Sequence, residues 1–208
     1  MKLSDFFEKV FVVNLDRRTD RLANIESQKD IIGKYTRFSA YDCNTLTTRP
    51  GKPPHNGFTT ISMGNYGNVL SQRKIIEELD MGMNIAENVL ILEDDVKFIR
   101  PFDEFLNSVP KNWDMIYFGG NHVEPLIPID RTVGKCQMTL TAHAVAMRYT
   151  IASEIMYQSR NKNIPIDLYY AMLHKKYNVY CPLQCIATQI SGYSDIESKE
   201  VDYSMVIK

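Results

Sequence analysis

Two short apolar runs constrain the fold of this chain more than any other feature. Residues 10–15 read VFVVNL, and residues 88–95 read NVLILEDD. In each run the apolar residues follow one another without polar alternation, which is typical of a strand buried on both faces. A sheet built on such strands needs helices over both faces, so the two runs favour an α/β fold.

Helical and extended segments alternate along the rest of the chain. Further strands are predicted at 35–42, 113–118, 138–147 and 179–190, and helices at 17–32, 64–81, 102–109, 149–161 and 167–176, with Asp16 as a helix cap. Two stretches rich in Pro and Gly, 43–58 and 121–137, predict long loops. The alternation indicates a mainly parallel central sheet. The length of 208 residues with 44% hydrophobic content suits a single domain, 1–208, ending in a tail over 197–208.

The overall composition excludes several classes of protein. A formal net charge of −1 gives no reason to expect nucleic acid or an anionic membrane as a partner. We find no signal peptide and no segment long and apolar enough to span a bilayer, so a cytoplasmic protein is expected. Of the four cysteines only Cys181 and Cys185 are close in sequence, which is a weak signal for zinc. Phosphate-loop, dinucleotide-binding and nucleophile-elbow motifs are absent from the sequence.

Three acidic residues, Glu93, Asp94 and Asp95, follow the second apolar run directly. Ligands of open α/β sheets bind beyond the carboxyl ends of the strands, where this cluster is expected to lie. Along a strand Glu93 and Asp95 would share a face, and two carboxylates there suit a hard cation such as Mg²⁺ or Mn²⁺. The alternative is an ordinary polar strand end, and the residues alone leave both interpretations open.

Seven segments, in one order along the chain, resemble glycosyltransferase family 25. They are VFVVNLDRRTDRLANI, RFSAYD, GNVLSQRKII, LILEDDV, TAHAVAM, the PID of Pro165–Asp167, and QISGYSDI, and they extend from residue 10 to residue 196. LILEDDV resembles the family's version of the D-x-D motif. The third segment departs from the family pattern, because Gln72 stands where a His usually follows the Ser.

The resemblance implies a GT-A-like nucleotide-binding fold and an inverting, metal-dependent transferase. The expected donor is a UDP-sugar, with galactose or glucose as the hexose, and the expected cofactor is Mn²⁺ or Mg²⁺. The acceptor would be a hydroxyl group of a glycan, a lipooligosaccharide or a protein, and lipopolysaccharide biosynthesis is one setting for the family. Two alternatives stay open, namely a non-catalytic module that binds nucleotide-sugars or glycans, and a nucleotidyltransferase using the same acidic pair.

Candidate site residues follow from the resemblance together with their positions. Asp95 is expected to hold the metal with help from Glu93. Residues expected to bind the nucleotide-sugar are Asn14 and Leu15 at the end of the first strand, Arg17 and Arg21 after it, and Asp42, Ser71, Glu93, Asp94, Gly119 and Gly120. An inverting transfer needs a general base, and Asp167 and Asp195 are the candidates. A helix N-cap is the competing role for Asp167.

Overall fold

The computed structural model describes residues 1–45, 61–80, 86–161 and 163–203. An eight-stranded sheet in the order β2-β1-β3-β10-β5-β11-β8-β7 forms its centre. The strands are β1 Lys9–Asn14, β2 Thr36–Ser39, β3 Asn88–Glu93, β5 Met115–Tyr117, β7 Ile127–Pro128, β8 Val133–Lys135, β10 Ala144–Arg148 and β11 Val179–Pro182. All of them run in one direction except β10 and β8, which are antiparallel to their neighbours. The predicted α/β fold with a mainly parallel central sheet is therefore confirmed.

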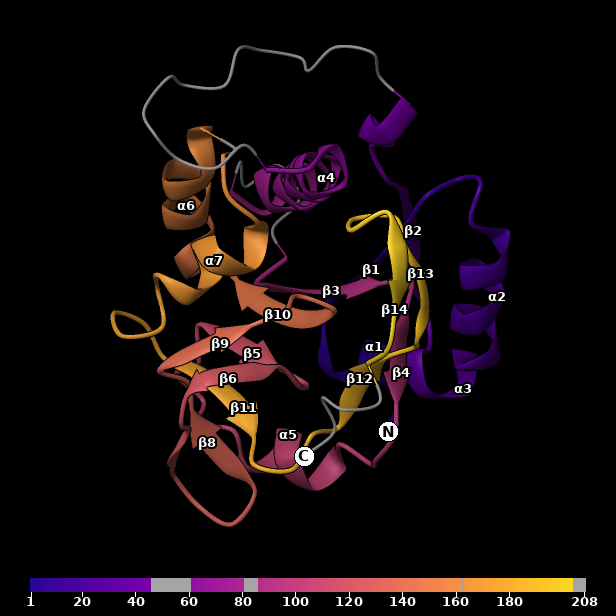
Figure 1. Cartoon of the computed structure of the whole chain (residues 1–208). Coiled ribbons are helices and arrows are strands. Elements are labelled where there is room, and N and C mark those ends of the chain that lie inside the picture. Colours follow the sequence, from indigo (N-terminus) through magenta and orange to yellow (C-terminus); the bar gives the residue numbers. More distant parts are fainter. Residues whose placement is uncertain (46–60, 81–85, 162, 204–208) are drawn as a thin grey trace.

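Helices cover both faces of the sheet, as Figure 1 shows. On one face lie α4 Met63–Asp80, α6 Tyr149–Gln158 and α7 Ile166–Ala171, and around the other lie α1 Leu3–Phe6, α2 Thr19–Ser27, α3 Lys29–Ile32 and α5 Asp103–Ser108. Short 3-10 turns, η1 Cys43–Thr45 and η2 Ser159–Asn161, complete the helical elements of the described ranges. Phe11 and Val13 of β1 pack into the core under α4, whereas Val10 and Val12 pack into the opposite core. The apolar run thus feeds two cores, as a strand buried on both faces must.

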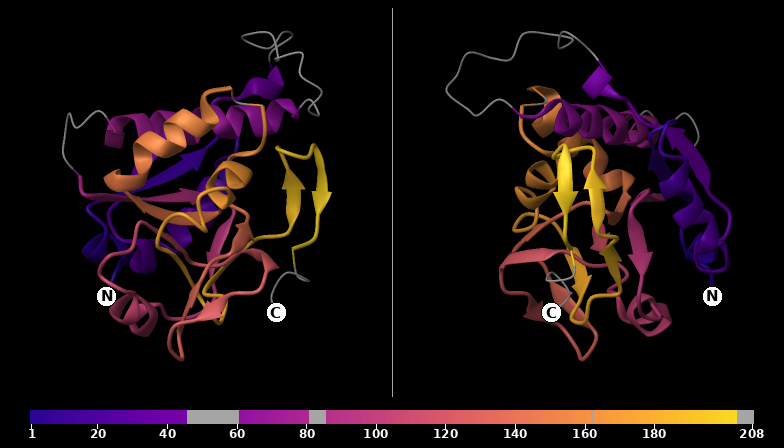
Figure 2. Two further views of the ribbon diagram at one scale, coloured as in Figure 1. Left: turned by 90° about the vertical axis from the view of Figure 1, so that its left-hand side faces the viewer. Right: turned by 45° about the vertical axis from the view of Figure 1, so that its right-hand side comes forward.

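Three small sheets flank the central one. They pair β6 Asn121–Glu124 with β9 Met138–Leu140, β4 Val96–Phe98 with β12 Ala187–Gln189, and β13 Gly192–Ser194 with β14 Lys199–Val201. The β13–β14 hairpin stands at the end of the sheet toward which β1 and β3 point (Figure 2). Residues 197–203 therefore do not form the predicted tail, since part of this segment pairs as a strand, while 204–208 lie outside the described residues.

The prediction of a long loop at 121–137 is wrong. It contains β6, β7 and β8, because its Pro and Gly residues occupy positions where a strand tolerates them. Pro128 lies on β7, an edge strand, where a missing N–H removes no ladder bond. A Cβ at Gly134 would come within 2.9 Å of Leu126 and Leu183, so close packing explains this glycine.

Several predicted elements are interrupted, and the strand predicted over 179–190 is divided into β11 and β12, which belong to different sheets. The helix predicted over 17–32 begins only at Thr19 and is divided at Gln28, and the side chain of Asp16 does not cap it. Asp16 instead accepts hydrogen bonds from Arg37 and Ser39. The strand predicted over 138–147 breaks at Thr141, whose φ of 73° is incompatible with a strand.

The predicted loop at 43–58 falls largely outside the described residues.

All four cysteines are free thiols. Within the described ranges, none of the helices has both the length and the apolar character required to cross a bilayer.

Candidate functional site

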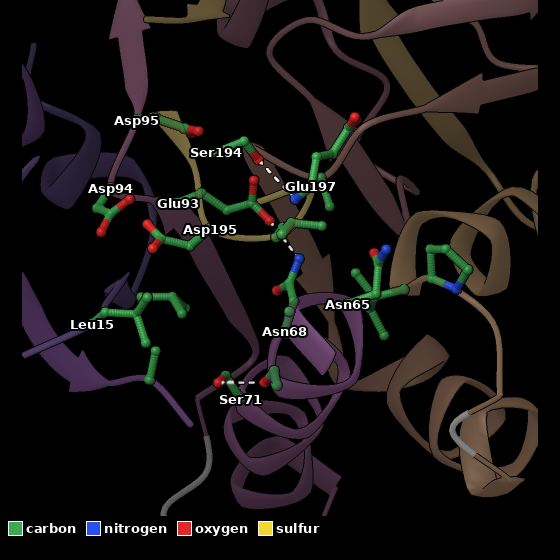
Figure 3. Close-up of a pocket in the computed structure, with 18 of the residues that line it drawn as sticks. Leu15, Asn65, Asn68, Ser71, Glu93, Asp94, Asp95, Ser194, Asp195 and Glu197 are labelled. Carbon is green, nitrogen blue, oxygen red and sulfur yellow. Dashed lines mark hydrogen bonds between the residues drawn. The ribbon is translucent and has the colours of Figure 1, made fainter. Parts of the chain in front are cut away.

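A cavity of about 500 Å³ opens at the carboxyl ends of β1 and β3. Figure 3 shows Glu93, Asp94, Asp95 and Asp195 gathered around it, with Asn68 extending toward Glu93 and Ser71 lying lower on α4. Nine of the predicted site residues line the cavity, namely Leu15, Arg21, Asp42, Ser71, Glu93, Asp94, Asp95, Asp167 and Asp195. Asn14, Arg17, Gly119 and Gly120 do not line it.

The acidic cluster is a strand end followed by a turn. β3 ends at Glu93, and Asp94 and Asp95 turn the chain into β4. Strand alternation therefore does not extend beyond Glu93, and Asp94 faces the cavity together with the other two rather than away from it. Sequence periodicity could not foresee this, since it assumes a straight strand.

Glu93 is held by neutral partners. The Asn68 side chain donates to its Oε1 atom at 2.9 Å, and the Gln72 side chain donates to the same atom at 3.2 Å. Gln72 also accepts a hydrogen bond from the buried hydroxyl of Tyr170 at 2.7 Å. Burial, and then the neighbouring charge of Asp95, raise the pKa of Glu93 to about 8. Gln72, at the position where the family pattern has His, thus links Glu93 to α7.

Asp94 and Asp95 share one guanidinium. Arg21 Nη1 lies 3.0 Å from Asp94 Oδ1 and 3.2 Å from Asp95 Oδ2. Asn14 donates to Asp94 at 2.8 Å from behind the cavity, and Gln189 donates to Asp95 at 3.3 Å. Burial raises the pKa of both aspartates, and Arg21 acts in the opposite direction. Asp95 Oδ1 is buried and has no hydrogen-bond partner.

The charge balance of this cluster fits a bound cation. Asp94 and Asp95 share the single guanidinium of Arg21, and Glu93 has no cationic partner in the described ranges, although buried charge is costly without a partner. Within the described ranges, no group of three His, Cys, Asp or Glu side chains is arranged to hold a metal ion. A metal held by Asp95 and Glu93 would need water or ligand phosphate to complete its shell, as is usual for Mg²⁺.

Two further arginines join the C-terminal hairpin to the start of the chain. Arg17 pairs with Asp42 and with Asp195 Oδ1, each at 2.7 Å, and Arg18 pairs with Asp195 Oδ2 and with Asp20. Both oxygens of Asp195 are thus occupied by arginines. Arg17 precedes α2, so it does not share a helix face with Arg21, as the helix predicted over 17–32 would require.

The opposite wall carries Asp167. The helix α7 takes Pro165 as its N-cap, so Asp167 lies inside the first turn and is not the cap. Its Oδ2 accepts a hydrogen bond from the backbone N–H of Thr141 at 3.0 Å, and its Oδ1 accepts one from Leu168 at 2.9 Å. No cation contacts Asp167 within hydrogen-bond or ion-pair distance among the described residues. This wall is therefore held by uncharged groups.

Ser71, Gly119 and Gly120 have packing explanations. Ser71 donates to Gly67 O at 2.7 Å and accepts from Tyr41 N at 2.9 Å, which ties α4 to the segment after β2. A Cβ at Gly119 would lie 2.1 Å from Ala187 O, and one at Gly120 would lie 2.5 Å from Thr139 Cγ2. Their roles toward a nucleotide-sugar remain predictions.

The structure also brings in residues that the sequence analysis did not select. Arg18, Asn68, Thr141 and Gln189 all contact the acidic residues or line the cavity. Asn68 and Gln72 lie one helical turn apart in GNVLSQ, so a shared helix face was a signal that pointed to Asn68. Thr141 and Gln189 depend on long-range packing, for which the sequence carries no local signal.

Comparisons with known proteins agree with the resemblance. The family described as "Glycosyltransferase family 25 (LPS biosynthesis protein)" matches residues 7–170. A rat protein named "Probable inactive glycosyltransferase 25 family member 3" is 31% identical over 57% of this chain and 24% of its own length. A mimivirus protein named "Putative glycosyltransferase R655" is 34% identical over 50% of this chain and 33% of its own length. The matches thus span only a quarter to a third of these relatives.

Among solved structures, A197 from STIV is similar with a TM-score of 0.50 at 12% identity, covering 94% of this chain and 93% of that one. At this identity the similarity concerns the fold alone. The family match extends over most of the chain and includes β1, the acidic turn and Asp167. The chain therefore belongs to glycosyltransferase family 25.

Proposed function

We propose that this protein transfers a hexose, galactose or glucose, from a UDP-sugar to a hydroxyl group of a glycan, lipooligosaccharide or protein acceptor, with inversion and with Mn²⁺ or Mg²⁺ as cofactor. The observation that carries the proposal is the unpartnered Asp95 Oδ1 in a cavity with an excess of buried carboxylates. Family membership supports a nucleotide-sugar donor.

Asp95 and Glu93 would hold the divalent cation, which supplies Lewis-acid stabilisation of the departing diphosphate when it is bound. Arg21 keeps Asp94 and Asp95 oriented by contacting both carboxylates. Asn68 and Gln72 fix the Glu93 carboxylate from the side of α4. The protein thus orients its carboxylates before any donor arrives, which limits reorganisation during transfer.

Asp167 is the proposed general base. Its two oxygens each accept one backbone N–H, and a carboxylate oxygen has a second lone pair that can receive the proton of the acceptor hydroxyl. Asp195, the other candidate, would first have to leave Arg17 and Arg18. The contacts therefore favour Asp167.

A second candidate function has a specific observation behind it. Several relatives are named inactive members of the family, among them the human and mouse proteins. A non-catalytic nucleotide-sugar or glycan-binding module would keep the cavity and the acidic turn while lacking turnover.

Release of UDP separates these functions. The protein is incubated with UDP-galactose or UDP-glucose and Mn²⁺, first alone and then with lipooligosaccharide or a hydroxyl-bearing peptide as acceptor. We expect UDP release that depends on Mn²⁺ and is lost in Asp95→Asn but kept in Asp130→Asn, whose carboxylate is exposed and lies outside the cavity lining. Binding without turnover would favour the non-catalytic module, and pyrophosphate release from a nucleoside triphosphate would favour a nucleotidyltransferase.

A further inference from the structure

Thr141 has an unusual backbone conformation. It lies between β9 and β10 with a φ of 73°, and only one other non-glycine residue of the described ranges, Ser198, has a positive φ. A β-branched side chain in this region is a genuine outlier, because Cβ crowds the backbone. Such strain persists only where the surroundings impose it, and it concentrates at functional sites.

The surroundings of Thr141 fix it on both sides. Its N–H donates to Asp167 Oδ2 at 3.0 Å. Two residues earlier, the N–H of Thr139 donates to the buried ring of His174 at 3.2 Å, and two residues later, the carbonyl of His143 accepts from Glu93 N at 2.9 Å. The corner formed by residues 139–143 is therefore held by hydrogen bonds to α7, to the segment that follows α7, and to β3.

The Thr141 hydroxyl has no partner. Its Oγ1 atom is buried and makes no hydrogen bond, although the residue lines the cavity. Oγ1 lies beside Gly120, where a Cβ would approach it to 3.6 Å, an ordinary packing distance, and Gly120 does not line the cavity. A buried hydroxyl normally finds a partner, and rotation about χ1 is the movement that would bring this one from beside Gly120 to a ligand in the cavity.

The position of Thr141 indicates which part of the ligand it meets. Because Glu93 N bonds His143 O, the corner lies just beyond the end of β3, beside the acidic turn. The arginines lie on the side of β1 and α2, whereas Thr141 lies beside Asp167, which no arginine or lysine contacts in the described ranges. A hydroxyl suits a sugar hydroxyl, because it can both donate and accept, and it brings no positive charge to a diphosphate.

We propose that Thr141 is a specificity-determining residue whose hydroxyl forms a hydrogen bond with one hydroxyl group of the donor hexose. Asp167 positions Thr141 by accepting a hydrogen bond from its backbone N–H. The inference rests on the proposed function, and it deepens that function by assigning the sugar end of the same cavity.

Two matched variants test the assignment. Thr141→Ser keeps the hydroxyl and Thr141→Ala removes it, while both retain a Cβ at the same backbone position. Calorimetry measures the affinity for UDP and for UDP-galactose and UDP-glucose, each with Mn²⁺. We expect Thr141→Ala to bind UDP within twofold of the wild type but to bind the preferred UDP-hexose about 3- to 10-fold more weakly, the effect of one lost hydrogen bond. Thr141→Ser should remain close to the wild type for both ligands.

A series of UDP-hexoses with single deoxy positions then identifies the sugar hydroxyl. Removal of the hydroxyl that Thr141 bonds should weaken binding in the wild type but have no further effect in Thr141→Ala. Thr141→Gly, which relieves the backbone strain and also lacks the hydroxyl, should repeat the Thr141→Ala result in a fold that is not destabilised.

The outcomes separate this inference from the proposed function. If the wild type binds no nucleotide-sugar, the proposed function and this inference both fail. If the wild type binds one and the Ala, Gly and Ser variants bind it equally well, only the role of Thr141 is overturned. A loss that extends equally to UDP would also overturn it, because the hydroxyl would then not act on the sugar.

Discussion

The two walls of the cavity are built from different chemistry. On the side of β1 and α2, which we call the ionic wall, each aspartate that lines the cavity is paired with Arg17, Arg18 or Arg21, and each pair includes a side chain that is at least half-buried. On the side of α7, which we call the α7 wall, Asp167 accepts the backbone N–H groups of Thr141 and Leu168, and no arginine or lysine contacts Asp167 or Thr141 in the described ranges. A wall of ion pairs can exchange its carboxylates for phosphate, whereas a carboxylate with no arginine or lysine beside it suits an uncharged hydroxyl group. Under the proposed function, the ionic wall would take the diphosphate of a nucleotide-sugar and the α7 wall its sugar.

The largest effect is expected from a change at Asp167, the proposed base on the α7 wall. Asp167→Asn should reduce the transfer rate by roughly 10²–10⁴-fold if Asp167 is the base. It should also destabilise the fold by about 1–3 kcal/mol, because one of the two backbone N–H groups then faces an amide NH₂ group. UDP affinity should stay near the wild-type value, since the base faces the acceptor.

Asp114→Asn is the matched control for this loss of stability. Both oxygens of Asp114 also accept hydrogen bonds, from Thr150 and from Asn178 N, and Asp114 does not line the cavity. This variant should lose stability and keep its rate. If Asp167→Asn transfers sugar at a rate like that of Asp114→Asn, Asp167 is not the base, and Asp195 becomes the candidate.

The ionic wall can be broken at Arg21. Arg21→Met removes the cation between Asp94 and Asp95, and an uncompensated buried charge costs about 3–5 kcal/mol. Urea unfolding at pH 7 measures the loss, and Mn²⁺ should restore more stability to this variant than to the wild type. Arg131→Met is the control, since its pair with Glu104 is exposed and should contribute less than about 1 kcal/mol. Equal stability of Arg21→Met and Arg131→Met would show that the ionic wall does not depend on Arg21.

The fold around the α7 wall should lose stability in acid. Burial lowers the pKa of His174 to about 4, and its ring accepts the Thr139 N–H and contacts the Tyr117 hydroxyl. The unfolded chain binds this proton near pH 6.5, so the stabilisation is complete above that pH and is lost as the pH falls toward 4, by about 2–3 kcal/mol for this residue. Thermal melts between pH 7 and pH 4 measure it. His174→Gln should flatten the dependence, and an unchanged pH profile in that variant would contradict the assignment.

The regular part of the fold could be predicted from the sequence, and much of the site could not. The apolar runs identify β1 and β3, because a strand buried on both faces consists of consecutive apolar residues. The acidic residues that follow β3 do lie at the cavity. The bond between Thr141 and Asp167 joins residues 26 positions apart, and no local pattern encodes it. The pairing of Asp195 with Arg17 and Arg18 likewise depends on where the C-terminal hairpin folds back.

Element ends were less predictable than element centres. The turn at Asp94 and Asp95 and the left-handed Thr141 both interrupt segments whose composition favours a continuing strand. Both interruptions lie at the cavity, where tertiary contacts override local preference.

The account depends most on the claim that the ionic wall binds a divalent cation through Asp95. Titration calorimetry of UDP with and without Mn²⁺ tests it directly, in the wild type and in Asp95→Asn. Because Asp95 Oδ1 is buried without a partner, we expect Mn²⁺ to tighten UDP binding by roughly 10-fold or more in the wild type, which is about 1.4 kcal/mol, and to leave the affinity of Asp95→Asn unchanged. Equal tightening by Mn²⁺ in both proteins would contradict the claim.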